Sequence, residues 1–97
     1  MAKFILTDEV VAHINNIRDY TRNKWGKQQV GQYLSALRTA LSQLAENPLM
    51  GTLRFKENGI YSFPYASHTI YYAVQKEQIV ILAILHQSMT PEIHLNR

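Results

Sequence analysis

One group of side chains in the sequence could cleave RNA without a metal ion. Such a reaction needs a base for the 2′-hydroxyl proton, an acid for the leaving oxygen and cations for the phosphate. His86 could act as the base or the acid, while Arg54 and Lys56 could neutralise the phosphate. A plainer interpretation is also open, in which His86 seals the end of a strand and Arg54 faces solvent. These three residues are weak nuclease candidates.

The other reactive residue types do not form a recognisable site. The four histidines include no pair spaced i, i+4, and no suitably spaced carboxylate joins His86 to His94. The chain has no cysteine, so disulfides and thiolate metal sites are excluded. Its four glycines are scattered and form no phosphate-binding loop, and Ser88 lacks the sharp turn of a nucleophile. We therefore expect neither a metal nor a cofactor.

Size and composition indicate a single globular domain. The chain has 97 residues, of which 46 % are hydrophobic and 18 % are charged, and no segment approaches the length of a membrane span. The N-terminal apolar stretch is too short for a signal peptide, and the lack of cysteine fits a reducing compartment. We expect a soluble, cytoplasmic protein. Its net charge of +3 is lower than that of most dedicated nucleic-acid binders, so sequence-specific nucleic-acid binding is not expected.

The basic residues are concentrated near one point of the chain. Four of them lie within ten positions that contain a single acid, Asp19: Arg18, Arg22, Lys24 and Lys27. They form either a solvated helix face or a surface for an acidic partner. Trp25 lies among them and is either a packing residue or an anchor for a partner, since tryptophan is enriched at binding hot spots.

The first half of the chain predicts a strand and two helices. Residues 3–6 favour a short strand, and Thr7 is a suitable N-cap for an amphipathic helix over residues 8–22. A second helix begins near Lys27 and ends at Asn47-Pro48, because proline restricts the residue before it. Its apolar stripe steps by four, three, four and three residues: Val30, Leu34, Leu37, Leu41 and Leu44.

After Gly51 the hydrophobic period changes from that of a helix to that of strands. Strands are expected at 52–56, 60–65, 68–74 and 79–86. Asn58-Gly59 is a strong hairpin-turn signal, and Pro64 places its strand at an edge or a bulge. The last strand is apolar almost throughout, which is typical of a central strand that is covered on both faces.

These elements predict an α+β domain of order β-α-α-β-β-β. An N-terminal strand and a helix hairpin would pack on a small antiparallel sheet. The hairpin can cover one face of the last strand. The other face would be covered by the C-terminal tail or by a partner.

Several segments together resemble the ParE branch of the RelE/ParE toxin superfamily, along nearly the whole chain. The most specific are "YTRNKWGKQQ" between the helices, "LAENP" at the end of the second helix and "ILHQSM" at the end of the last strand. The resemblance implies the toxin of a type II toxin–antitoxin pair, such as those that maintain plasmids. It also implies a non-enzymatic inhibitor that traps the cleaved-DNA complex of DNA gyrase through the A subunit. A cognate antitoxin would neutralise it.

RelE-like relatives share this fold but cleave mRNA on the ribosome, which makes nuclease activity the alternative. Such nucleases generally carry a catalytic tyrosine at the end of the last strand or in the C-terminal segment. Here no tyrosine follows Tyr72, a departure that counts against RNA cleavage, although Glu92 and His94 could in principle serve.

Two surfaces are predicted on this basis. The gyrase-contact candidates are apolar or aromatic: Met89, Ile93, Leu95 and Trp25. Within the tail, Met89, Ile93 and Leu95 could instead fold back to complete the core. The antitoxin-binding candidates lie on the hairpin, where an antitoxin segment would cover exposed apolar groups and basic residues: Tyr20, Leu37, Leu41, Arg18, Arg22 and Arg38.

Overall fold

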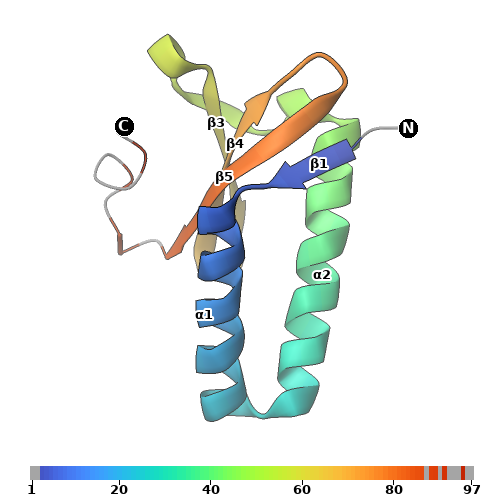
Figure 1. Ribbon diagram of the computed structural model, residues 1–97, viewed down its shortest axis with the longest axis vertical. Coiled ribbons are helices and arrows are strands. Elements are labelled where there is room, and N and C mark those ends of the chain that lie inside the picture. The colour runs from blue at the N-terminus through green and yellow to red at the C-terminus, as the bar shows by residue number, and fades with distance from the viewer. Residues whose placement is uncertain (1–2, 87, 90, 92–94, 96–97) are drawn as a thin grey trace.

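A computed structural model describes residues 3–86, 88, 89, 91 and 95. Within these residues the helices and strands follow the predicted order (Figure 1). The elements are β1 (Lys3–Leu6), α1 (Asp8–Trp25), α2 (Lys27–Glu46), β2 (Thr52–Phe55), β3 (Ile60–Tyr65), β4 (His68–Val74) and β5 (Gln78–His86). Two short 3-10 turns, η1 (Pro48–Met50) and η2 (Lys56–Asn58), flank β2. Neither helix of this described part is long and apolar enough to cross a membrane.

The helix hairpin is bounded by residues with clear local roles. The Thr7 hydroxyl accepts a hydrogen bond from Val10 N at 3.3 Å and donates one to the carbonyl of Ile81 at 3.1 Å, which caps α1 and joins it to the sheet. The first helix continues to Trp25, three residues beyond the predicted end. Gly26 terminates it with φ 91°, a conformation that residues with a Cβ rarely adopt.

The sheet has the strand order β1-β5-β4-β3-β2. Strands β2 to β5 pair antiparallel, as predicted, whereas β1 pairs parallel with β5 from Lys3↔Gln78 to Leu6↔Ile81. The sheet is therefore mixed, and β5 is an interior strand between β1 and β4. The long connection from β1 to β5, which contains both helices and three strands, permits the parallel pairing.

The β2–β3 region differs in detail from the predicted tight hairpin. Residues 56–58 form the turn η2, and Gly59 follows in the left-handed conformation, so the connection is longer than a two-residue turn. Pro64 pairs with Thr69 of β4, but the pairing of β2 with β3 stops at Ser62. Pro64 therefore lies where β3 is locally an edge, as expected for a residue without a backbone N–H.

A bulge interrupts the regular pairing of β5 with β4. One step on β4, from Tyr71 to Tyr72, is matched by two on β5, from Ala83 to Ile81, so Leu82 is the extra residue. The bulge reverses the side-chain alternation along the strand. As a result, Ile81 and Ile84 both face the helices.

Two hydrophobic clusters cover the two faces of the sheet. The larger joins the sheet to apolar residues of both helices, including Val10, Leu37, Leu41 and Leu44. The smaller lies on the other face and consists of Ile60, Tyr71, Ala83 and Leu85, with Phe55, Leu82 and Leu95 packed against it. The prediction that β5 is covered on both faces is confirmed.

The expectation that Leu37 and Leu41 present exposed surface to an antitoxin is wrong. Each is 3 % exposed and lies in the larger core cluster. The hairpin has one strongly apolar face, and the sheet already occupies it. These two leucines therefore belong to the core and offer no binding surface in this structure.

Candidate functional site

A groove of about 790 Å³ lies between the free end of the helix hairpin and the adjacent end of the sheet. The hairpin extends beyond the ends of the strands, so its last turns have no sheet beneath them (Figure 1). Tyr20, Lys24 and Trp25 of α1 line this groove, together with Tyr33 of α2. Further lining comes from the β3–β4 turn, from His68 at the start of β4, from His86 at the end of β5 and from Met89. We call this the hairpin groove.

Lys24 holds two exposed aromatic side chains of the groove together. Its ammonium lies 5.5 Å from the ring centroid of Tyr20 and 5.5 Å from that of Trp25, and it donates a hydrogen bond to the Tyr20 hydroxyl at 3.1 Å. Tyr20 is 61 % exposed and Trp25 is 63 % exposed. Two large, solvent-exposed rings fixed around one cation are typical of a binding surface.

A polar cluster forms the floor of the groove at the strand ends. His68 pairs directly with His86 across β4 and β5, and their ring centroids lie 5.4 Å apart with perpendicular planes. The Tyr33 hydroxyl lies 3.3 Å from Nδ1 of His68. On the other side, Nδ1 of His86 accepts a hydrogen bond from Ser88 N at 3.2 Å and lies 2.8 Å from the Ser88 hydroxyl.

The environment of this cluster shifts two of its pKa values. Burial, with a further contribution from the neighbouring Tyr65, raises the pKa of Tyr33 to about 12. The phenol of Tyr33 therefore stays protonated at neutral pH. Burial, followed by the proximity of His86, lowers the pKa of His68 below its usual range. The two effects favour the uncharged forms of Tyr33 and His68 at neutral pH.

This arrangement predicts a loss of stability in mild acid. Because the pKa of His68 is lowered on folding, the unfolded chain binds the proton more tightly. The contribution of neutral His68 to stability is present above pH 6.5, the ordinary pKa of histidine. It is lost as the pH falls through the lowered pKa of the folded state. The measurement is urea unfolding at pH 7.5, 6.5 and 5.5. The free energy of unfolding should fall less between pH 7.5 and pH 5.5 in His68→Gln than in the unsubstituted protein. Identical pH profiles for the two proteins would contradict this assignment.

The predicted nuclease residues do not come together. His86 pairs with His68, which pairs in turn with Tyr65 at one end of β3, whereas Arg54 lies on β2 beside the other end. His86 and Arg54 are thus separated by three strand spacings across the sheet and by four to five residues along the strands. Together these correspond to roughly 20 Å. The guanidinium carbon of Arg54 lies 5.9 Å from the centroid of the Phe55 ring. Lys56 is exposed in the turn η2. The expectation that these cations serve His86 is wrong.

The basic antitoxin candidates are exposed on the helices. Arg18 and Arg22 each lie 3.5 Å from the carboxylate of Asp19, so the acid within this cluster binds both neighbours. Arg38 is exposed on α2. Such surface ion pairs add little stability, which leaves these side chains free to exchange partners.

The tail residues take different positions. Met89 is 48 % exposed and lines the hairpin groove, where it joins Trp25, another predicted gyrase contact. Leu95 is half-buried and packs against the smaller core cluster, which favours the core-completing alternative for this residue. Ile93 lies outside the described residues.

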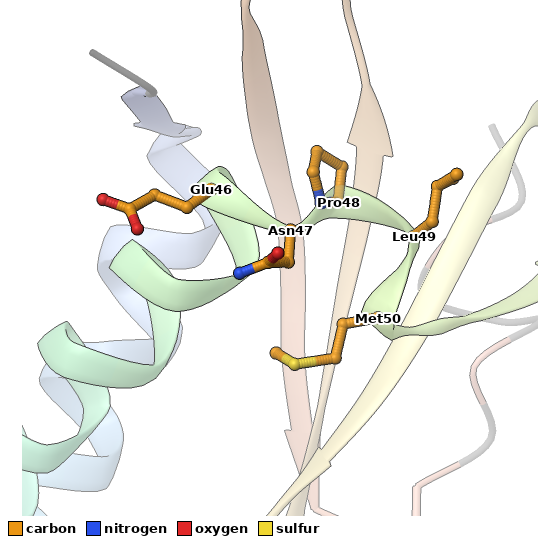
Figure 2. A pocket seen from close by; sticks show the side chains of 5 residues that line it. All are labelled: Glu46, Asn47, Pro48, Leu49 and Met50. Carbon is orange, nitrogen blue, oxygen red and sulfur yellow. The ribbon is translucent and has the colours of Figure 1, made fainter.

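A second, shallower hollow of about 500 Å³ lies where α2 passes into η1 (Figure 2). Leu49, which is 75 % exposed, and Met50, which is 44 % exposed, lie beside it. In Figure 2 the side chains of Glu46 and Leu49 point away from each other, and the side-chain amide of Asn47 donates to the carbonyl of Gln43 on α2 at 3.4 Å. Below it, the buried Tyr72 hydroxyl donates to the Pro48 carbonyl at 2.6 Å, which indicates a structural role for this region.

Reasoning from sequence missed the contacts of His68 with His86 and with Tyr33. The two histidines are 18 positions apart in the sequence, and only the strand register places them side by side. The contact between Tyr20 and Lys24 did have a sequence signal, because residues at i and i+4 are neighbours on a helix surface. Within the part of the chain that is described, no cluster of three or more metal-ligating side chains occurs.

Comparison with known proteins identifies the family. The model of the family described as "ParE toxin of type II toxin-antitoxin system, parDE" matches residues 4–91, which is most of the chain. The chain belongs to the ParE toxin family of type II toxin–antitoxin systems. This confirms the family predicted from the sequence.

Individual ParE proteins match along almost their full lengths. Toxin ParE1 of Mycobacterium tuberculosis is 31 % identical over 96 residues, which cover 97 % of this chain and 98 % of that one. Toxin ParE1 of Caulobacter vibrioides is 31 % identical over 98 residues, covering 98 % of this chain and 99 % of that one. The solved structure of the chromosomal ParDE TA system from P. aeruginosa has the same fold, with a TM-score of 0.74 at 18 % identity. That match covers 89 % of this chain and 96 % of the other.

Proposed function

We propose that this ParE-family protein inhibits DNA gyrase by trapping the enzyme's cleaved-DNA complex. The observation that carries the proposal is the hairpin groove, in which Trp25 and Met89, predicted as gyrase contacts from separate parts of the chain, lie on one surface. Membership of the ParE family supports gyrase as the target. A stoichiometric inhibitor of this kind needs an exposed binding surface rather than a catalytic group.

The distribution of charge supports a binder over the alternative nuclease. Cleavage of RNA requires cations that are held at the phosphate during the reaction. The candidate cations Arg54 and Lys56 lie at the far end of the sheet from His86. The described lining of the hairpin groove has one lysine, Lys24, near the two histidines, and no tyrosine follows Tyr72 in the sequence, so the mRNA endonuclease is the less favoured function.

We further propose that an antitoxin neutralises the protein by covering the hairpin groove. Tyr20 lies in the groove, and Arg18 and Arg22 are exposed on the same helix, so an antitoxin segment with acidic and apolar residues would find partners for both. Arg38 on α2 is a further candidate for this contact. Because Tyr20 and Trp25 are held by the same lysine, an antitoxin bound at Tyr20 would also restrict access to the proposed gyrase contact.

Induced expression in a bacterial host tests this function. We expect viable counts to fall by orders of magnitude, with accumulation of double-strand DNA breaks and intact mRNA. Co-expression of the antitoxin, sought in the adjacent reading frame, should restore growth. Growth arrest with cleaved mRNA and unbroken DNA would support the endonuclease instead.

A further inference from the structure

The hairpin groove combines flat aromatic surface with positive charge. Among its described lining residues Lys24 is the one permanent cation, and no aspartate or glutamate occurs. The groove also contains the side-chain amides of Asn16 and Gln29, which can donate and accept hydrogen bonds. This composition differs from that of a purely apolar peptide groove. It suits a ligand that has both anionic groups and planar rings.

The two rings are positioned to stack on such a ligand. Tyr20 and Trp25 expose 61 % and 63 % of their surfaces. The Lys24 ammonium lies 5.5 Å from each ring centroid and donates a hydrogen bond to the Tyr20 hydroxyl at 3.1 Å. Exposed aromatic rings beside a cation are the elements with which proteins bind single-stranded nucleic acids, because every base has a face that can stack.

The histidines on the floor of the groove add further hydrogen-bonding groups. His86 uses Nδ1 to accept from Ser88, and in its neutral form it carries its proton on Nε2. His68 likewise uses Nδ1 for its contact with Tyr33. The His86 imidazole can therefore donate through Nε2 to a phosphate or a base edge.

We propose that the hairpin groove binds a single-stranded DNA segment, with bases stacked on Tyr20 and Trp25 and a phosphate paired with Lys24. The choice of DNA rests on the proposed function, since the target is an enzyme that holds cleaved DNA. The protein would then contact the DNA strand as well as gyrase, and an antitoxin in the groove would exclude both. Recognition of this kind is independent of sequence and is compatible with the modest charge of the chain.

Trp25 provides a direct probe, because it is the only tryptophan in the sequence. Titration of the purified full-length protein with a ten-nucleotide oligothymidylate should quench its fluorescence to saturation. A ten-nucleotide abasic strand with the same phosphates should bind at least tenfold more weakly, since it cannot stack. A duplex of equal length should also bind more weakly, because its bases already stack on one another. Equal affinity for the thymidylate and abasic strands would overturn the proposal.

Two substitutions separate stacking from general electrostatic attraction. Tyr20→Ala should weaken thymidylate binding at least tenfold and leaves Trp25 available as the probe. Lys24→Gln should weaken binding and reduce the slope of log K against log salt by about 0.7, the value for one phosphate contact to a single strand. Lys76→Gln is the matched control, because it removes the same charge from the β4–β5 turn at the other end of the sheet. Equal effects of the two lysine substitutions would contradict a specific site.

Two further ligands test whether the hairpin groove binds RNA or an acidic peptide instead of single-stranded DNA. An oligouridylate of the same length should bind no more tightly than the thymidylate, and a ten-residue polyglutamate should not quench Trp25 comparably. A tenfold preference for uridylate would indicate an RNA site, and polyglutamate binding as tight as that of the thymidylate would indicate a site for negative charge alone, without stacking of bases. Either result would contradict the proposal.

The oligonucleotide-binding experiments and the gyrase assay test the two proposals separately. If gyrase is inhibited but the oligothymidylate does not bind, the groove proposal is wrong and gyrase inhibition stands. If the oligonucleotide binds with the expected dependence on Tyr20 and Lys24 but gyrase is unaffected, the single-strand site stands and gyrase inhibition is wrong.

Discussion

Trp25→Ala is expected to weaken gyrase inhibition by roughly 30-fold, because aromatic anchors of this kind contribute about 2 kcal/mol or more when they are removed from an interface. Trp25 is 63 % exposed and lies at the last position of α1, so its loss should leave the core intact. The measurement is the toxin concentration that half-inhibits DNA supercoiling by gyrase. Circular dichroism and urea unfolding would confirm that the variant is folded.

Leu49→Ala provides the matched control for this prediction. Leu49 is also exposed and apolar, at 75 %, but it lies beside the hollow at the end of α2, away from the hairpin groove. Its replacement should leave gyrase inhibition unchanged. Full activity of a folded Trp25→Ala variant would show that the groove is not the surface that engages gyrase.

Leu41→Ala is expected to lower the free energy of unfolding by about 2–5 kcal/mol, the usual range for truncating a buried leucine. The reason is its position in the larger core cluster with an exposure of 3 %. Small domains have only about 5–15 kcal/mol of stability in total, so this loss would be severe. It can be measured by guanidinium or urea unfolding.

The same substitution at Leu49 again gives the comparison. Exposed positions away from special features usually change stability by less than about 0.5 kcal/mol. If Leu41→Ala changed the free energy of unfolding as little as Leu49→Ala does, Leu41 would be a surface residue that is available to an antitoxin.

The sequence was sufficient for the fold because its local signals agree with one another. The helices are marked by Thr7, by the stripe of leucines on α2 and by Asn47-Pro48. The strands are marked by the change of hydrophobic period after Gly51. The parallel pairing of β1 was not predictable in this way, because it depends on contacts between distant parts of the chain. The bulge at Leu82 was hidden for the same reason, since an unbroken apolar run has no alternation to interrupt.

The candidate site was less predictable than the fold. Hydrophobic spacing identified Leu37 and Leu41 as one face of a helix, but spacing cannot say whether a sheet or a partner covers that face. Helical spacing could have paired Tyr20 with Lys24, whereas the contact of His68 with His86 required the register of β4 and β5. Charge alone suggested Arg54 and Lys56 as partners of His86, and the sheet topology separates them.

The most direct measurement of the central claim uses purified gyrase, supercoiled plasmid and this protein, with the DNA analysed after detergent and protease treatment. Trapping of the cleaved complex predicts that linear plasmid increases with the amount of toxin, that supercoiling activity falls in parallel and that added antitoxin reverses both effects. The same preparation should leave ribosome-bound mRNA intact. Unchanged gyrase activity with no linear plasmid, at toxin concentrations that arrest growth in cells, would contradict the account.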